Sequence, residues 1–456
     1  MLSVFVEISK YLFAFLLAFY TLAAYRGSVK RQSDKVQAVF IMQNILMFLI
    51  HLLGYVILFI VNDFDIKYVF LYAAQFLYLL VVIIAYDVIY KKSSKLLVNN
   101  MCMLIVIGFI MIARLNFDKC IKQFLITVCG TVLSFFVPWM LKKFKMLRNL
   151  GWLYCIAGVV LLTVVLFGNK VYGANLVLTI GPISVQPAEF VKIFFVLFVA
   201  SMYNKSTTFK QTVLVTILAA AHVIILVLST DLGAALIFFV VYLAMLYIAT
   251  KKVWYIAAGI GAGSAASVAA YHLFYHVKQR VLIWRNPWAT IDTSGYQICQ
   301  SLFAIGMGSW FGYGLGQGMP EKIPVAEKDF MFSAITEEFG IIFAISLILI
   351  CLDNLIIMMK IASRCNTLFY RLVAVGLGVT YGFQVFLTIG GAIKLVPMTG
   401  VTLPFVSYGG SSILSSLIAF ALINGMYNMR QNEVLSNEAT GKKKRKTTKT
   451  TKKAKE

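Results

Sequence analysis

Apolar segments long enough to cross a lipid bilayer recur along most of this chain. A membrane-spanning helix needs about 20 predominantly apolar residues. Hydrophobic residues make up 61% of the chain and charged residues 13%, compared with about 45–50% and about 25% in soluble domains. We therefore predict an all-α polytopic membrane protein with spans near 3–25, 36–61, 68–90, 97–114, 123–141, 150–168, 187–203, 211–229, 232–250, 253–275, 332–359, 370–390 and 405–428.

Lysine and arginine residues gather in alternate loops between these spans. Cytoplasmic loops carry an excess of both residues, so we expect the N-terminus outside and the basic tail 431–456 in the cytoplasm, where we predict disorder. This placement explains the net charge of +23 without nucleic acid as a partner. The tail serves topology and solvation, or it binds anionic lipid or a cytoplasmic partner. The first three basic loops hold Arg26, Lys30, Arg31 and Lys35, then Lys91, Lys92 and Lys95, then Lys142, Lys143, Lys145 and Arg148.

Cysteine and histidine spacing gives no sign of a metal centre or a disulfide framework. The seven cysteines include no C-x-x-C pair, and the four histidines have no metal-ligand spacing. The alternation of loops places two long segments outside, about 276–331 and 390–405. The second is apolar but interrupted by Pro397, Gly400 and Pro404. Non-helical backbone at membrane depth must be covered by protein or line a watered cavity, so we expect a site there.

The segment PEKIPVAEKDFMFSAITEEFG, residues 320–340, concentrates acidic residues at the start of a predicted span. Within it, Asp329 stands directly before an apolar run that opens with Phe330. One interpretation is a helix N-cap, for which Asp is a favoured residue. The other is a carboxylate at the mouth of a cavity, which acts as a base if partial burial raises its pKa against the helix field. The residues alone leave both open.

Two other acidic positions interrupt apolar segments. In VQPAEFVK, Glu189 and Lys192 lie three residues apart on one helix face, where they can pair. Charges within a span are costly and usually functional, and the alternative is a structural ion pair at the membrane interface. Asp231 in STDLGAALIFF either caps the next helix or lines a pocket.

Glycines and basic residues mark the first outer segment. The run SGYQICQSLFAIGMGSWFGYGLGQG, residues 294–318, is flanked by Arg280, Arg285, Lys322 and Lys328. Basic side chains beside such a run either hold a diphosphate or only solvate the loop. Later, LPFVSYGGSS opens the last span with small polar residues, including Ser407. These residues favour close helix packing first and site lining second.

Five motifs together resemble the SEDS family, the shape–elongation–division–sporulation proteins FtsW, RodA and SpoVE. In order, over about 97–430, they are VQPAEFVK, DLGAA, RVLIWRNPW with GYQICQSLFAIG, GYGLGQG with DFMFSAITEEFG, and VPMTGVTLPFVSYGGSS. The resemblance implies a core of about ten transmembrane helices at 93–430, with 276–331 as an extracellular catalytic loop. About three extra helices, 1–92, precede this core. Ala188, Asn286 and Lys328 depart from the usual Ser, Asp and Thr of the family.

The resemblance also implies an activity. Such proteins are inverting peptidoglycan glycosyltransferases that polymerise lipid II, an undecaprenyl-diphosphate-linked disaccharide pentapeptide, outside the bacterial plasma membrane. Their partner is a class B penicillin-binding protein, and a divalent cation (Mg²⁺ or Mn²⁺) is left open. The family's catalytic carboxylate corresponds to Asp329. The substrate-binding residues implied here are Arg280, Trp284, Lys322, Gln297, Glu189, Lys192, Asp231 and Ser407.

Two other functions are compatible with many spans and buried charges. A lipid II flippase or transporter should show alternating-access symmetry and a midplane site, and the sequence shows no inverted repeat. A non-enzymatic scaffold for cell division would not need Asp329. The motifs do not distinguish a role in division from one in elongation or sporulation.

Overall fold

The computed structural model describes residues 2–29, 34–167, 177–180 and 183–453, and these residues are almost entirely helical. Three helices come first: α1 (Leu2–Val29), α2 (Asp34–Val61) and α3 (Lys67–Ile89). Ten long helices follow: α4 (Lys95–Leu115), α5 (Phe117–Lys143), α6 (Gly151–Leu166), α7 (Pro187–Lys205), α8 (Phe209–Leu228), α9 (Leu232–Thr250), α10 (Val253–Leu273), α13 (Met331–Ser363), α14 (Leu368–Ala392) and α15 (Gly410–Lys453).

Short elements connect these helices. Between α10 and α13 lie α11 (Tyr275–Arg285), the 3₁₀ turn η2 (Pro287–Thr290), α12 (Tyr296–Met307) and η3 (Pro320–Lys322), and η1 (Lys145–Asn149) precedes α6. The strands β1 (Leu178–Ile180) and β2 (Ile183–Val185) pair antiparallel, with Leu178 opposite Val185. This hairpin is a small addition to the predicted all-α fold.

Twelve of the described helices are long and apolar enough to cross a membrane, and α6, with 16 residues, is a shorter apolar helix. These helices correspond to the thirteen predicted segments, so the polytopic helical fold is confirmed. α13 is longer than its predicted span and α5 begins six residues earlier, at Phe117. Both extensions are polar or amphipathic turns that a hydropathy pattern does not include.

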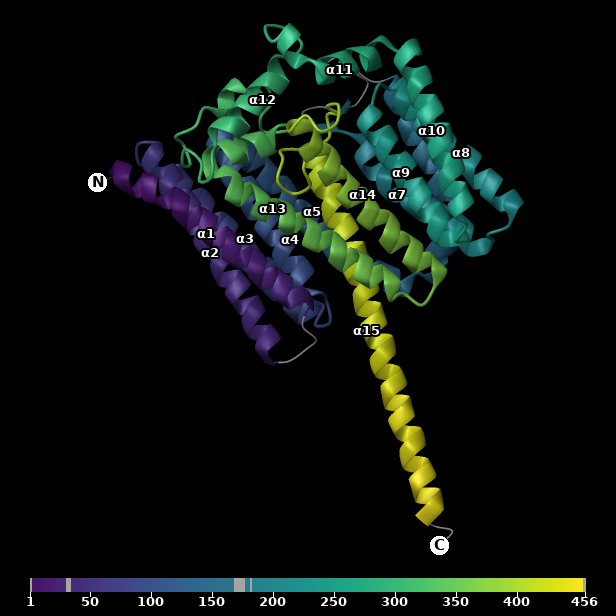
Figure 1. Ribbon diagram of the computed structural model, residues 1–456. Coiled ribbons are helices and arrows are strands. Elements are labelled where there is room, and N and C mark those ends of the chain that lie inside the picture. Colours follow the sequence, from purple (N-terminus) through teal and green to yellow (C-terminus); the bar gives the residue numbers. More distant parts are fainter. Residues whose placement is uncertain (1, 30–33, 168–176, 181–182, 454–456) are drawn as a thin grey trace.

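The two chain ends lie at opposite ends of the bundle, and α11 and α12 lie at the N-terminal end (Figure 1). Near that end the ring of Tyr11 in α1 lies 4.9 Å from the ring of Phe311, which follows α12. Near the other end the Lys92 ammonium donates to the Asn432 side chain. The arrangement fits the predicted topology. Which side of the membrane each end faces stays a prediction.

The basic tail was predicted to be disordered, whereas the structure continues α15 as a helix to Lys453. This part of α15 projects away from the bundle (Figure 1). Extending an existing helix costs far less than nucleating one, and α15 is already formed within the bundle from Gly410. The charge pattern of residues 431–456 alone does not show that the tail continues a helix that is already formed in the bundle.

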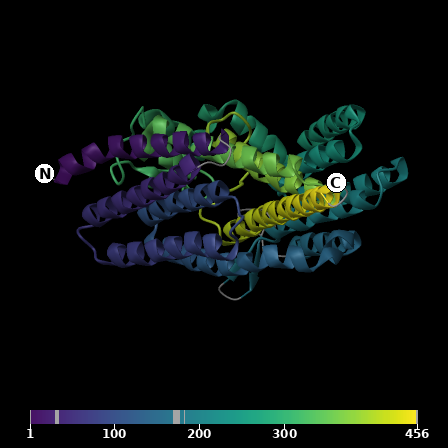
Figure 2. The same cartoon turned by 90° about the horizontal axis from the view of Figure 1, so that it is seen from below.

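The three N-terminal helices pack against the core. Viewed from below, α1 runs alongside the bundle (Figure 2). The fully buried Phe13 of α1 contacts the ring of Phe339 in α13 at 4.8 Å between centroids. A polar connection runs beside it: the Tyr20 hydroxyl donates to Asn100 of α4 at 3.1 Å, and Asn100 donates to Asp353 of α13 at 2.9 Å. The extra helices therefore contact the two helices that hold the centre of the core.

The helix α13 is broken at Gly340, whose φ of 83° and ψ of 174° are not helical. The glycine-rich run lies against this break: Tyr313 and Gly314 donate their N–H groups to the carbonyls of Glu337 and Glu338 at 3.0 and 2.9 Å. A Cβ atom on Gly312 would lie 2.1 Å from the Glu338 carbonyl oxygen. These glycines permit close backbone approach, so this part of the run has a packing role. Whether the flanking basic side chains hold a diphosphate stays a prediction.

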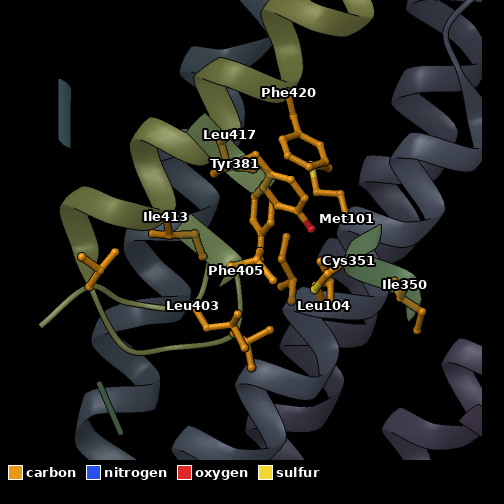
Figure 3. Packing of buried hydrophobic residues seen from close by; sticks show 14 of the residues in the cluster. Met101, Leu104, Ile350, Cys351, Tyr381, Leu403, Phe405, Ile413, Leu417 and Phe420 are labelled. Carbon is orange, nitrogen blue, oxygen red and sulfur yellow. The ribbon is translucent and has the colours of Figure 1, made fainter. Parts of the chain in front are cut away.

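The segment between α14 and α15, residues 393–409, is non-helical, as predicted from its prolines and glycine, and its second half is buried at Val401 and at residues 403–407. Leu403 and Phe405 enter the core between α4, α13 and α15 (Figure 3). The rings of Phe405 and Phe420 are 4.7 Å apart. Because aromatic burial dominates core energetics, this apolar anchoring holds the segment at one end of the bundle, beside the start of α13.

Candidate active site

Asp329 lies in the turn that precedes α13, and its side chain is half-buried. The N-cap position of this helix belongs to Phe330, which makes no side-chain capping bond. The N-cap interpretation of Asp329 is therefore wrong. Its carboxylate is left available, because none of the described residues is recorded as donating a hydrogen bond to it.

Arg280 of α11 interacts electrostatically with two carboxylates, those of Asp329 and Asp231. Its Nη1 atom lies 3.4 Å from the carbonyl oxygens of Met398 and Thr399. Burial lowers the pKa of this guanidinium, and the two carboxylates partly oppose that shift. α11, the 393–409 segment and the starts of α9 and α13 therefore meet at one place.

Gly400 completes this meeting point. Its φ is +74°, which favours glycine. The Oδ2 atom of Asp329 lies 3.9 Å from the position that a Cβ atom on Gly400 would take. The Asp329 carboxylate thus lies beside an exposed glycine.

Burial raises the pKa of Asp329 to about 6, while the charges of Lys328 and Arg280 lower it and the Glu327 carboxylate raises it. A catalytic base works best when its pKa lies near the operating pH. Asp329 is ionised above pH 6 and still basic enough to accept a proton from a hydroxyl group. This is the behaviour expected of a general base.

Asp231 caps α9, as one of its two sequence interpretations proposed. One carboxylate oxygen accepts the Ala234 N–H at 3.0 Å. The other, Oδ2, is buried and has no hydrogen-bond partner among the described residues. Capping is therefore confirmed. Arg280 acts electrostatically on this carboxylate, and lining of the site by Asp231 stays a prediction.

Glu189 and Lys192 form the predicted ion pair, with Lys192 Nζ 2.9 Å from Glu189 Oε1. Lys192 also donates to Gln384 Oε1 at 2.8 Å, and Gln384 donates to the Thr402 carbonyl at 3.0 Å. The Ser415 hydroxyl donates to the remaining Glu189 oxygen at 2.9 Å. Both charges are thereby satisfied at low exposure, as buried charges require.

This ion pair borders a cleft that encloses about 400 Å³ of empty space, part of it open to the surroundings. Tyr381, Ser415 and Phe420 also line it. The pair connects the cleft to the 393–409 segment through Gln384, and this segment also carries Gly400 beside Asp329. Glu189 and Lys192 are therefore connected to the surroundings of Asp329 only indirectly, by hydrogen bonds through Gln384 to the 393–409 segment.

The remaining predicted residues divide into two groups. Trp284 lies one turn beyond Arg280 and donates its indole N–H to the Lys394 carbonyl at 3.1 Å, which holds α11 against the 393–409 segment. Ser407 is buried beside the site, with both hydroxyl functions used by the backbone. Gln297 and Lys322 are exposed, and neither makes a recorded bond to Asp329 or Arg280 within the described ranges.

Lys322 instead faces a second charged cluster. Arg114 of α4 donates to Glu321 at 2.7 Å and to the fully buried Glu338 at 3.0 Å. Lys322 and Arg114 both act electrostatically on Glu337. Sequence reasoning missed Arg114, because single basic residues at the ends of apolar spans are common and are usually interpreted only as determinants of membrane orientation.

Sequence reasoning also missed Lys119 and Glu327, which form an ion pair next to Asp329. Glu327 was visible as one acid among five, with no pattern to single it out. Its partner Lys119 lies 208 residues earlier, in the first turn of α5. No local signal could have joined them.

Among the residues that the structure describes, no three His, Cys, Asp or Glu side chains lie together in a way that could hold a metal ion. Hard cations prefer several oxygen ligands, so the side chains of the described residues do not by themselves fit a resident ion. Binding of Mg²⁺ or Mn²⁺ stays a prediction.

Comparison with known proteins identifies relatives of this chain. The profile of the FtsW/RodA/SpoVE family, described as cell cycle protein, matches residues 94–432. The peptidoglycan glycosyltransferase RodA of Mycobacterium bovis is 32% identical over 361 residues, covering 73% of this chain and 77% of the relative. A probable peptidoglycan glycosyltransferase FtsW from Nitrosococcus halophilus is 31% identical over 317 residues, covering 66% and 81%.

A solved structure gives the same result for the fold. A chain from a study called "Structural coordination of polymerization and crosslinking by a peptidoglycan synthase complex" superposes with a TM-score of 0.66 at 25% identity. The match covers 74% of this chain and 98% of that chain. The helices α1 to α3 lie before the residues that match the family profile.

Proposed function

Because the chain belongs to the FtsW/RodA/SpoVE family of cell cycle proteins, we propose that Asp329 is the catalytic base of its reaction. The chain is a multi-pass membrane protein and a peptidoglycan glycosyltransferase, the activity named for its RodA and FtsW relatives. One observation carries the assignment of the base. A half-buried carboxylate with a pKa of about 6 lies beside an exposed glycine and interacts with a half-buried arginine.

The proposed substrate is lipid II. The growing strand ends in a sugar attached to an undecaprenyl diphosphate, and a second lipid II presents its 4-hydroxyl group. Asp329 removes the hydroxyl proton as the oxygen bonds to the anomeric carbon, and the sugar–diphosphate bond breaks. One displacement inverts the configuration and needs a base only on the acceptor side, unlike the two-carboxylate hydrolases. The diphosphate leaves with the bonding electron pair.

Arg280 is proposed to stabilise the departing diphosphate. It is half-buried, carries a fixed positive charge and lies close enough to Asp329 for their charges to interact. Preorganised cations placed where negative charge develops are among the largest catalytic contributions. Asp231 also acts electrostatically on Arg280. No step is assigned to a divalent cation.

The location and partner follow from the same premise. The site lies at the end of the bundle opposite the basic tail (Figure 1), and we place it at the outer face of the plasma membrane, where the positive-inside rule puts that end. We propose a class B penicillin-binding protein as partner, since a related chain belongs to a synthase complex that couples polymerization to crosslinking. The transporter alternative predicts no product in detergent micelles, where no second compartment exists.

Arg280→Ala tests the diphosphate role. Loss of hydrogen bonds to a charged group costs about 1.5–3 kcal/mol, so we expect kcat/KM for lipid II polymerisation in detergent to fall about 10-fold to 100-fold. Arg285→Ala is the matched control, because Arg285 lies on the same helix and is exposed. Equal kcat/KM values for the two variants would refute the role of Arg280.

A further inference from the structure

The turn that carries Asp329 has little regular structure of its own. Residues 324–330 form consecutive turns, and Val325 adopts a φ of +58°, which is unfavourable for a β-branched residue. Such a conformation persists only when its surroundings hold it. The position of the Asp329 carboxylate therefore depends on contacts made by its neighbours.

The backbone on the N-terminal side of Asp329 is held by the turn before α15. The Lys328 carbonyl accepts a hydrogen bond from the Ser407 hydroxyl at 2.5 Å, and the Glu327 carbonyl accepts the Tyr408 N–H at 2.7 Å. Ser407 Oγ in turn accepts the Leu403 N–H at 3.0 Å. Ser407 is 3% exposed, so this hydroxyl contacts backbone and not substrate.

A second attachment comes from α5. The Glu327 carboxylate pairs with the Lys119 ammonium, which also lies over the Tyr408 ring at 5.9 Å from its centroid. Lys119 itself sits in a rigid first turn, because its N–H donates to the Asn116 cap at 2.9 Å. The ion pair is partly buried, where charge pairs are screened less than at the surface.

We propose that Ser407 and the Lys119–Glu327 pair are positioning residues that hold the 327–329 backbone so that the Asp329 carboxylate stays beside Gly400. The inference rests on the proposed role of Asp329 as base. It assigns Ser407 a different role from the substrate binding that the sequence implied. A misplacement of about 1 Å costs on the order of 100-fold in rate, so two attachments on adjacent residues are sufficient to control catalysis.

The proposal also makes Glu327 an electrostatic neighbour of the base. Burial raises the pKa of Glu327, and the pairing with Lys119 outweighs this and lowers it, so the group is ionised. Its negative charge raises the pKa of Asp329, whereas Lys328 on the same turn and Arg280 on α11 lower it. Removing the Glu327 charge should therefore shift the ionisation of Asp329 to lower pH.

The experiment measures kcat, KM and the pH dependence of lipid II polymerisation by the full-length protein. We expect Ser407→Ala to lower kcat about 10-fold to 100-fold with KM for lipid II unchanged, and Ser407→Thr, which keeps the hydroxyl, to recover most of that loss. Ser267→Ala is the matched control, because its exposed hydroxyl bonds only a carbonyl of its own helix.

Glu327→Gln provides the readout that a purely structural role would not change. We expect a lower kcat and an acid limb of the rate profile displaced to lower pH. The exchanged pair Lys119→Glu with Glu327→Lys should regain part of the kcat lost by either single change. If Ser407→Ala fails to fold, Glu327→Gln decides alone.

Asp329→Asn in the same assay separates the two proposals. An inactive Asp329→Asn with wild-type kcat and an unmoved acid limb in Glu327→Gln overturns the positioning role and leaves the base assignment intact. An active Asp329→Asn overturns the base assignment itself, and the positioning proposal with it.

Discussion

Asp329→Asn is expected to give a folded, membrane-inserted protein whose rate of lipid II polymerisation is reduced by about 10²–10⁴-fold, the contribution of a positioned general base. Asn has nearly the same shape as Asp but does not accept the proton. Folding should be preserved, because the Asp329 carboxylate receives no recorded hydrogen bond that the change would break. Burial of an unbonded carboxylate is costly, so thermal stability should be equal or slightly higher.

Asp292→Asn is the matched control for this substitution. Asp292 lies in the same connection between α10 and α13, carries the same charge, and is exposed. We expect it to polymerise lipid II at the wild-type rate. A wild-type rate for Asp329→Asn as well would remove the base from the mechanism.

Arg114→Ala should cause the largest loss of stability among single substitutions considered for this chain. Glu338 is fully buried and Arg114 is its ion-pair partner at 3.0 Å, with only 14% of the arginine side chain exposed. Removing one partner of a buried pair leaves an uncompensated charge, at a cost of about 3–5 kcal/mol. We expect the structural change to be centred on the break in α13, because the Glu338 carbonyl also accepts the Gly314 N–H there.

The free energy of unfolding in a denaturing-detergent titration measures this effect. Lys95→Ala serves as control, because the Lys95–Asp87 pair is exposed on both sides and should contribute within about 1 kcal/mol. Arg114→Ala combined with Glu338→Gln should recover part of the loss by removing the stranded charge. A loss below about 1 kcal/mol for Arg114→Ala alone would show that the pair does not support the break.

Much of the architecture follows from hydropathy alone. An apolar stretch in lipid has to satisfy every backbone group internally, so the thirteen predicted segments and the thirteen long helices agree. The non-helical segment after α14 was also readable, because Pro397 and Pro404 interrupt an apolar run that has to be buried. The break at Gly340 was not readable, since one glycine in a long apolar run gives no such signal.

Motifs in the sequence singled out several residues that the structure brings within electrostatic range of one another. Asp329, Arg280 and Asp231 come from three motifs separated by up to about a hundred residues, and both carboxylates act electrostatically on Arg280. Gln297 and Lys322 belong to the same motifs and are exposed. A match to a family motif identifies candidate residues, but it does not by itself show which of their side chains contact a substrate.

Residues that act through the backbone were not predictable. Ser407 reads as a packing or lining residue in its sequence context, and its contact with the Lys328 carbonyl spans 79 positions. Lys119 and Arg114 are single charges near the ends of apolar spans, where positive residues are common. Their partners are Glu327 in the turn before α13 and Glu338 within α13, and both pairs become visible only when α4, α5 and these two segments are placed together.

The pH dependence of lipid II polymerisation by the unaltered protein tests the central claim most directly, because the pH profile of kcat/KM reports the ionisation of essential groups in the free enzyme. With the pKa of Asp329 raised to about 6, a base that has to be ionised predicts a plateau above pH 7 and a loss approaching tenfold per pH unit below about pH 5. A rate that stays constant from pH 4 to pH 8 would contradict the assignment of Asp329 as the catalytic base.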